Sequence, residues 1–128
     1  MKAKKIIRSN PHLPVKNLRQ TLDHYRETLG FYDEWTWPDK NGNPIDGGIR
    51  RDEMRLLFGE EPDIVDRNAK IRLSIIWFVE NIEDIYTEFQ ARGIVIAAGL
   101  KTQPYGLREF AFIDINGYYI RVAEGVEA

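Results

Sequence analysis

Few residues of this chain have types and spacings that would support catalysis. The chain has no cysteine, which excludes a thiol nucleophile, disulfides and cysteine-ligated zinc. It has neither a Gly-x-Ser-x-Gly turn nor a glycine-rich phosphate-binding motif. Aspartate and glutamate total 20, but no spacing singles out a pair for acid–base work. Two polar residues in apolar strand-like segments remain of interest, His12 and Arg121.

Aromatic residues point to a second kind of chemistry, the binding of flat ligands. Trp35 and Trp37 are two residues apart, so they share one face if their segment is a strand. Tyr105 lies in a loop just before the last strand pair. Two aromatics on one face either pack in a core or form a stacking platform, and the spacing is compatible with both.

The elements that would position these residues occur twice. The segments VKNL, from Val15, and VENI, from Val79, are 64 positions apart, and each opens a helical pattern. Asn17 and Asn81 are expected to cap the two helices, and Gly30 and Gly93 to end them. The apolar stripes are Leu18, Leu22, Tyr25 and Leu29 in the first helix, and Ile82, Ile85, Tyr86 and Phe89 in the second.

Extended segments separated by turns surround each helix. A strand is expected before each, over 6–15 and 71–79, and three strands after each, with a reversal near Arg51 in the first half and a turn at Asn116-Gly117 in the second. This predicts an α+β fold of two βαβββ modules forming open curved sheets. The modules would span 1–60 and 71–128 of a single domain, 1–128, with a polar linker over 61–70.

Composition limits the partners. A net charge of −2 and a pI of about 5.7 argue against nucleic-acid binding. No apolar run approaches the ~20 residues of a membrane span, and Arg8 interrupts the apolar start of the chain after two residues. We therefore expect a cytoplasmic protein without nucleic-acid or membrane partners.

The sequence resembles the vicinal-oxygen-chelate superfamily, which includes glyoxalases, dioxygenases and bleomycin-resistance proteins. PHLPVKNLRQTLDHYRETLGF is similar to the opening strand and helix of that family, and QPYGLREFAFIDINGYYI is similar to its closing loop and hairpin. The resemblance covers nearly the whole chain. Its pattern is nearest to bleomycin-resistance-like members, in which Pro-Trp-Gly often stands where this chain has Pro104-Tyr105-Gly106.

The resemblance implies four positions at which metal-dependent members hold their metal. Counting from Val15, Val79 and Gly117 places three of them at Asn10, Ser74 and Arg121, and the fourth near Leu57. Divalent metals prefer imidazole and carboxylate ligands, and arginine keeps its positive charge in proteins. We therefore expect no metal and no other cofactor. His12 is expected to contact a ligand or a neighbouring residue, and Glu124 to be a surface charge.

Alternation along the strands predicts which side chains line a cleft and which pack under the helices. The expected ligand-binding residues are Asn10, His12, Trp35, Trp37, Leu57, Ser74, Phe78, Tyr105, Tyr119 and Arg121, with Ile76 on the same face. The expected core residues are Leu13, Val15, Ile75, Trp77, Ile120 and Val122.

The resemblance implies a metal-free protein that binds a small molecule and sequesters an aromatic, cationic antibiotic of the bleomycin class, with no catalytic residue. Asp33 and Glu34 would supply an acidic mouth, while Arg121 would favour an anionic group at the floor. The alternative is a metal-dependent lyase, isomerase or dioxygenase of the same superfamily. A third possibility is a module that binds an unrelated metabolite. Family relatives also imply a homodimer.

Overall fold

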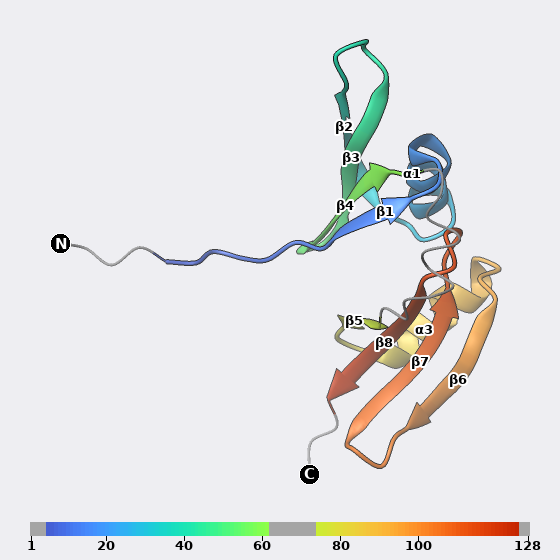
Figure 1. Ribbon diagram of the computed structural model, residues 1–128. Coiled ribbons are helices and arrows are strands. Elements are labelled where there is room, and N and C mark those ends of the chain that lie inside the picture. The colour runs from blue at the N-terminus through green and yellow to red at the C-terminus, as the bar shows by residue number, and fades with distance from the viewer. Residues whose placement is uncertain (1–4, 62–73, 126–128) are drawn as a thin grey trace.

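The computed structural model describes residues 5–61 and 74–125, which form two sheets and two helices (Figure 1). Each helix follows the first strand of its half. The first half comprises β1 (His12–Val15), α1 (Leu18–Glu27), β2 (Tyr32–Pro38), β3 (Pro44–Arg51) and β4 (Met54–Glu60). The second comprises β5 (Ser74–Phe78), α3 (Ile82–Ala91), β6 (Ile96–Thr102), β7 (Leu107–Ile113) and β8 (Tyr119–Gly125).

The two sheets have the same topology. Their strand orders are β1-β4-β3-β2 and β5-β8-β7-β6, with the first and last strands of each half parallel and the other neighbours antiparallel. The repeat extends to individual residues, because His12 pairs with Leu57 and, 64 positions later, Ile76 pairs with Arg121. The predicted α+β fold of two βαβββ modules is confirmed.

Some predicted boundaries differ from the structure. The first strand begins at His12, not Ile6, and residues 5–11 extend away from the body of the protein (Figure 1). The predicted linker, apart from Glu61, lies outside the described residues, as do residues 71–73 of the predicted second-half strand. Neither helix in the described ranges has the length and apolar character needed to cross a membrane.

The two helices are capped differently, although both N-cap residues are asparagine. Asn17 accepts a hydrogen bond from the Gln20 backbone N at 2.8 Å, as predicted. Asn81 has left-handed backbone (φ 56°), and its side chain makes no capping bond, so the predicted side-chain cap is wrong. The carboxylate of Glu124 instead accepts hydrogen bonds from the Asn81 and Ile82 backbone N atoms at 2.8 and 3.2 Å.

Glu124 is therefore a structural cap, and its prediction as a surface charge is wrong. The first half contains the equivalent interaction, because the Glu60 carboxylate accepts a hydrogen bond from the Leu18 backbone N at 2.9 Å. Glu124 lies 64 positions after Glu60, and Ile82 lies 64 positions after Leu18, so the two caps are equivalent in the repeat. The last strand of each half in chain order, β4 or β8, thus supplies an acidic cap to the helix of that half, where a carboxylate also interacts favourably with the helix dipole.

The two halves share one apolar core. Trp77 of β5 lies between Phe31 of the first half and Phe112 of the second, with ring centroids 5.6 and 5.4 Å away. Tyr25 of α1 contacts both Phe31 and Phe58 and lies 6.3 Å from Trp77. Such aromatic pairs stabilise a fold by about 0.5–1.5 kcal/mol each beyond their area burial. The residues predicted to pack under the helices all belong to this core or to its edge.

Polar contacts fix the orientation of the halves. The Tyr25 hydroxyl donates a hydrogen bond of 2.7 Å to Asp114, and the Tyr118 hydroxyl donates one of 2.6 Å to the Pro14 carbonyl. Burial raises the pKa of Asp114, although hydrogen bonds from Tyr25 and two backbone N–H groups oppose that effect. Burial, together with the adjacent carboxylate, also raises the pKa of the Tyr25 phenol.

Tyr25→Phe should lower the free energy of unfolding by roughly 1–3 kcal/mol, because it leaves one oxygen of the buried Asp114 carboxylate without this donor. Urea denaturation followed by circular dichroism measures the change. Tyr86→Phe is the matched control, since the Tyr86 ring packs on Phe110 and its hydroxyl makes no hydrogen bond within the described residues. The control should change stability by less than about 0.5 kcal/mol. Equal losses in the two variants would contradict this role of the Tyr25–Asp114 bond.

Candidate functional site

Each sheet has one face away from its helix, and these open faces carry most of the predicted ligand-binding residues. In the first sheet, the register aligns Trp35 with Gly48 and Trp37 with Asp46, while His12 aligns with Leu57. Gly48 also aligns with Leu57, so these residues lie on one face. Neighbours in the chain on the opposite face, such as Leu13, Ile49 and Phe58, are buried under α1.

Two glycines allow side chains to lie flat on the first face. A Cβ at Gly48 would come within 2.4 Å of the Trp35 ring, and one at Gly59 within 2.7 Å of the His12 ring. The missing side chains therefore make room for an indole and an imidazole against the sheet. His12 Nε2 lies 3.0 Å from the Asp46 carboxylate, so this histidine contacts a neighbouring residue, one of the two roles predicted for it.

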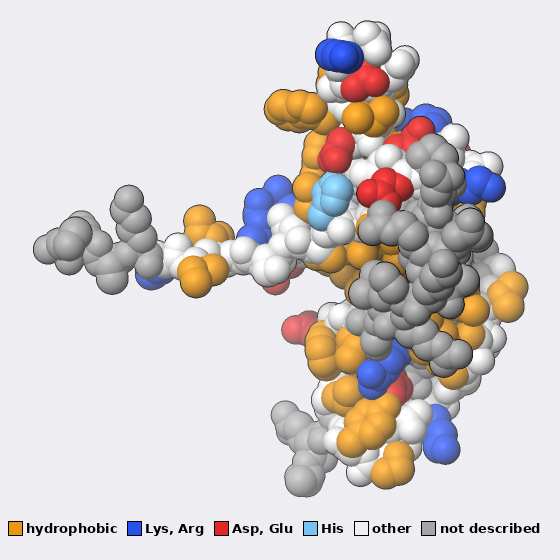
Figure 2. Space-filling view, in the orientation of Figure 1, with side chains coloured by type: hydrophobic (Ala, Val, Ile, Leu, Met, Phe, Trp, Pro, Cys, Tyr) orange, Lys and Arg blue, Asp and Glu red, His pale blue; other side chains and the backbone are white. Residues whose placement is uncertain are grey.

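The first face is open to a ligand at its outer strand. Trp37 is 71% exposed, whereas Trp35 and Leu57 are half-buried. Asn10 is exposed and precedes β1, so it lies beyond the strand on which it was expected. Figure 2 shows hydrophobic side chains at the surface of both the β2–β3 hairpin and the second sheet. An exposed tryptophan on a strand is suited to stacking on a flat ligand.

The second sheet presents an equivalent face. Ser74 aligns with Tyr119, Ile76 with Arg121 and Phe78 with Ala123. The alternate residues Trp77 and Val122 are buried, which places Ile76, Phe78 and Arg121 on the side of the sheet away from α3. Phe78 is 68% exposed and Tyr119 is 42% exposed. A pocket of about 220 Å³ lies on this face, and the described residues that line it belong to the second half, including Gln103, Tyr105, Glu109, Tyr119 and Arg121. Apart from Asn10 and the loop residue Tyr105, the predicted site residues therefore belong to two separate sheets.

Arg121 forms an ion pair with Glu109, a contact that the sequence did not reveal. Its Nε donates to Glu109 at 2.9 Å and its Nη2 at 3.1 Å, and Glu109 is only 6% exposed. Tyr105 completes the cluster: its hydroxyl binds Glu109, it accepts a hydrogen bond from Arg121 at 3.0 Å, and its ring lies 5.7 Å from the guanidinium. The free basic floor expected at Arg121 is therefore wrong, because a buried carboxylate neutralises it.

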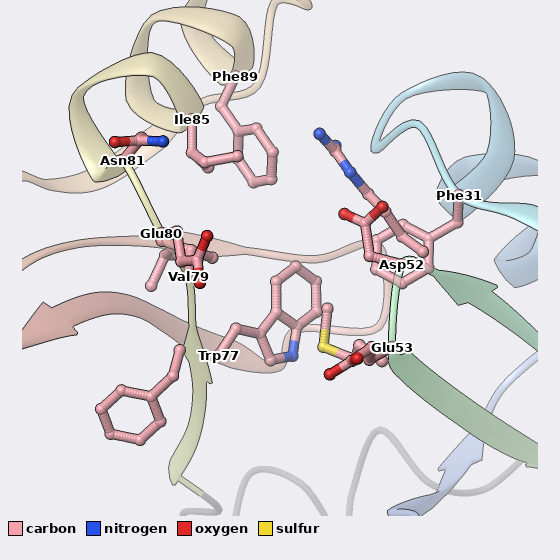
Figure 3. Close-up of a pocket in the computed structure, with 13 residues that line it drawn as sticks. Phe31, Asp52, Glu53, Trp77, Val79, Glu80, Asn81, Ile85 and Phe89 are labelled. Atoms are coloured by element: carbon pink, nitrogen blue, oxygen red, sulfur yellow. The ribbon is translucent and has the colours of Figure 1, made fainter.

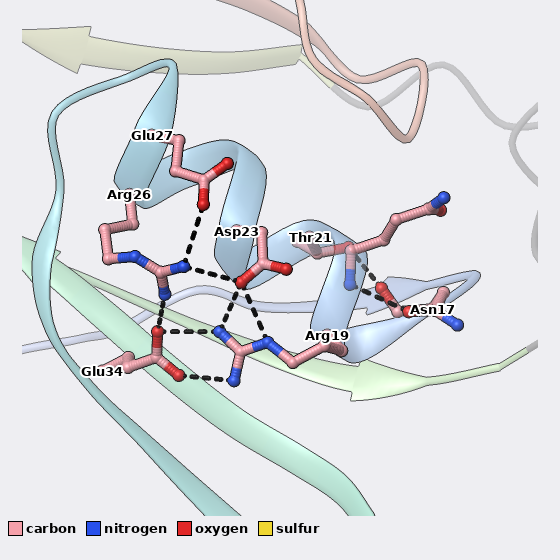
Figure 4. Close-up of polar contacts among 8 residues, drawn as sticks. Asn17, Arg19, Thr21, Asp23, Arg26, Glu27 and Glu34 are labelled. Atoms are coloured by element: carbon pink, nitrogen blue, oxygen red, sulfur yellow. Dashed lines mark hydrogen bonds and ion pairs between the residues drawn. The ribbon is translucent and has the colours of Figure 1, made fainter.

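The expected acidic mouth is also neutralised. Glu34 forms ion pairs with Arg19 and Arg26 of α1 (Figure 4). The hydrogen bond from Arg19 is the main reason why the pKa of Glu34 lies below its ordinary value. Asp33 pairs with Arg50 at 2.8 Å. These ion pairs join β2 to α1 and to β3, so neither carboxylate is free to attract a cationic ligand.

The residues at the four implied metal positions do not fit a divalent metal. Leu57 is apolar, Arg121 is a paired cation, and Asn10 and Ser74 are neutral. Carboxylate or imidazole ligands are missing from this set. In the part of the chain that the structure describes, no three His, Asp or Glu side chains gather closely enough to hold a metal ion.

Comparisons with known proteins agree with this architecture. Residues 8–122 match the Glyoxalase/Bleomycin resistance protein/Dioxygenase superfamily. A bleomycin-binding protein from Streptomyces verticillus, solved with copper(II)-bleomycin, has a TM-score of 0.75 and 20% identity over 96% of this chain and 99% of its own. A glyoxalase-related enzyme from Clostridium phytofermentans has a TM-score of 0.76 and 17% identity, covering 98% and 100%.

A bleomycin resistance determinant encoded on the transposon Tn5 is similar to the same extent, with a TM-score of 0.75 and 19% identity over 94% of this chain and 98% of its own. At these identities the likeness concerns the fold. The search of curated proteins found no match.

Arg121→Ala should lower the free energy of unfolding by roughly 1–3 kcal/mol, because it leaves the buried Glu109 carboxylate without its charged partner. The double variant Arg121→Ala/Glu109→Gln should recover part of this loss, and urea denaturation measures both. Arg108→Ala is the control, since its partner Glu83 is 68% exposed and surface pairs contribute about 0–1 kcal/mol. A loss at Arg121 no larger than that at Arg108 would contradict the role given to Glu109.

Proposed function

The chain belongs to the Glyoxalase/Bleomycin resistance protein/Dioxygenase superfamily, and from that premise we propose that it is a metal-free protein that binds a flat aromatic small molecule. The observation that carries this proposal is the open face of the first sheet, where the Trp35 ring lies over Gly48 and Trp37 is 71% exposed beside it. Two indoles on one face form a stacking surface for a flat ligand.

The ligand class that we propose is an antibiotic of the bleomycin type. Two relatives by fold have names that connect them to bleomycin, one as a binding protein and one as a resistance determinant. Two of the charged side chains on these faces are paired within the protein, Arg121 with Glu109 and His12 with Asp46. We expect aromatic stacking and apolar burial to supply most of the affinity.

Titration with bleomycin should quench tryptophan fluorescence in a saturable way, because a flat drug would stack on Trp35 and Trp37. Calorimetric titration of Trp37→Ala should give an affinity about tenfold weaker, which corresponds to a loss of ~1–2 kcal/mol. Trp37 is largely outside the core, so the variant should fold normally.

The control is Val95→Ala, which removes an 83% exposed apolar side chain from the loop between α3 and β6. It should bind as the unmodified protein does. If neither fluorescence nor calorimetry detects binding of bleomycin, with or without copper(II), the proposed ligand class is wrong.

Protein purified without a histidine tag and dialysed should hold no stoichiometric zinc, nickel, iron or manganese. The reason is the donor set at the four implied positions, which lacks imidazole and carboxylate groups. Elemental analysis measures this directly. One equivalent of a transition metal surviving dialysis would overturn the metal-free proposal and favour a lyase, isomerase or dioxygenase.

We also propose that two copies associate. Residues 5–11 extend from the body (Figure 1), and their side chains Ile6 and Ile7 are 96% and 88% exposed. The aromatic faces of both sheets are exposed as well, and apolar surface of this kind often marks a contact between proteins. A second copy would cover this surface and turn the open face of each sheet into one wall of a cleft.

Light scattering should therefore give a mass of about twice the 14.9 kDa of the chain, because a symmetric dimer would bury the projecting segment. The measurement is made at micromolar concentration and moderate salt, with a concentration series. A mass of one chain throughout the series would contradict the dimer and the shared clefts.

A further inference from the structure

The two halves of the chain differ at a pair of equivalent turns. The turn between β7 and β8 packs against β1 and α1, whereas the turn between β3 and β4 faces β5 and α3. The 64-residue offset makes Met54 equivalent to Tyr118, and Asp52 equivalent to Asn116. The elements that the turns face, β1 and α1 in one case and β5 and α3 in the other, are also equivalent in the repeat. The two turns therefore show how different side chains fill equivalent positions.

In one half, the turn fills its position with side chains. Tyr118 is 3% exposed and donates its hydrogen bond to the Pro14 carbonyl. The Asn116 amide donates to the Thr21 hydroxyl at 3.1 Å, and its oxygen accepts from the Lys16 backbone N at 3.3 Å. This turn therefore closes the space between the halves with a large ring and a polar network.

In the other half, the equivalent space is open. Met54 replaces the tyrosine, and a cavity of about 720 Å³ lies between its turn and the second half. Figure 3 shows Phe31, Trp77, Phe89 and Ile85 forming apolar walls, with acidic side chains around them. The size is in the range of small-molecule pockets, which are mostly apolar with a few polar groups.

An unpaired hydrogen-bond donor lies just beneath the cavity wall, covered by neighbouring side chains. Trp77 is 5% exposed, and its Nε1 makes no hydrogen bond within the described residues. Figure 3 shows this nitrogen on the side of the ring toward Glu53, among the residues that line the cavity. Burying an N–H group without an acceptor costs free energy, so buried indoles usually have a partner. Leu13, the equivalent residue in the filled half, has no such group.

The charges around the cavity favour a cation. Asp52, Glu53 and Glu80 are exposed lining residues, and none forms an ion pair within the described part of the chain. Arg51, the basic lining residue, is held by Glu88 through two bonds of 2.7 and 2.6 Å and donates to the Leu29 carbonyl. The hydrogen bond to Glu88 is the main reason why the pKa of the Arg51 guanidinium is raised, and the charge of Asp52 also acts on Arg51 and contributes to that raised pKa. The carboxylates of Glu53 and Glu80 are therefore left to attract a positively charged group.

We propose that this inter-module cavity is a second binding site, for a small organic cation with a flat apolar body and a hydrogen-bond acceptor. The apolar body would lie between Trp77 and Phe89, the acceptor would receive the Trp77 N–H once the side chains that cover it move, and the ammonium group would face the carboxylates of Glu53 and Glu80. The flexible Met54 side chain can move to admit it. This site is separate from the stacking surface formed by Trp35 and Trp37.

The three tryptophans of the chain allow the two sites to be distinguished in one experiment. Nuclear magnetic resonance of the indole N–H groups should give three signals, assigned by Trp→Phe variants. Addition of para-methoxyphenethylamine, which is a cation with an ether acceptor, should shift the Trp77 signal and leave those of Trp35 and Trp37 in place. The anion para-methoxyphenylpropionate has the same ring and acceptor and should not bind. An unmoved Trp77 signal, or equal binding of cation and anion, would overturn the proposal.

Two kinds of variant test the parts of the site. Glu53→Gln and Glu80→Gln change exposed residues and should each weaken cation binding about two- to fivefold, whereas Glu27→Gln on α1 should not. Met54→Tyr recreates the plug of the other half and should abolish the Trp77 shift. Unchanged affinity in both Glu53→Gln and Glu80→Gln would overturn the role of the carboxylates, and unchanged binding to Met54→Tyr would overturn the location.

Discussion

The two halves of this chain share one apolar core, in which side chains of each half cover side chains of the other. The sharing is visible in Trp77, a residue of the second half whose ring contacts Phe31 of the first. Tyr25 extends the same cluster from α1 and hydrogen-bonds Asp114 across the boundary. The shared core fixes the two sheets relative to each other, and every functional feature follows from that arrangement.

One consequence is that the sheet faces away from the helices remain available. The core uses one side of each sheet, and the alternation of strand residues sends the other side chains outward. Glycines at positions 48 and 59 keep part of the first face flat, so that aromatic and imidazole rings can lie on it. The face of the second sheet is instead occupied by the Tyr105–Glu109–Arg121 cluster. Equivalent faces of a duplicated fold have therefore acquired different chemistry.

The same divergence affects the boundary between the halves. One turn carries Tyr118 and closes its side, whereas the other carries Met54 and leaves a cavity beside Trp77. Both helix caps, in contrast, have kept their carboxylates at Glu60 and Glu124. Backbone groups at the helix ends need hydrogen-bond partners in both halves, whereas side chains that only fill space can differ between the halves and leave a cavity.

The sequence by itself determined the repeated modules, the helix faces and the alternation of the strands, because these depend on periodicity and on short-range capping such as that by Asn17. It also showed that the implied metal positions lack suitable ligands. Only the tertiary structure decided which charges meet. Glu109 lies 12 positions from Arg121, and Glu124 lies 42 positions from the helix residue Ile82 that it caps. The first pair forms where two strands align and the second where a strand passes the end of a helix, and local patterns carry little information about either approach. The cavity beside Trp77 was hidden for the same reason, since its walls come from both halves of the chain.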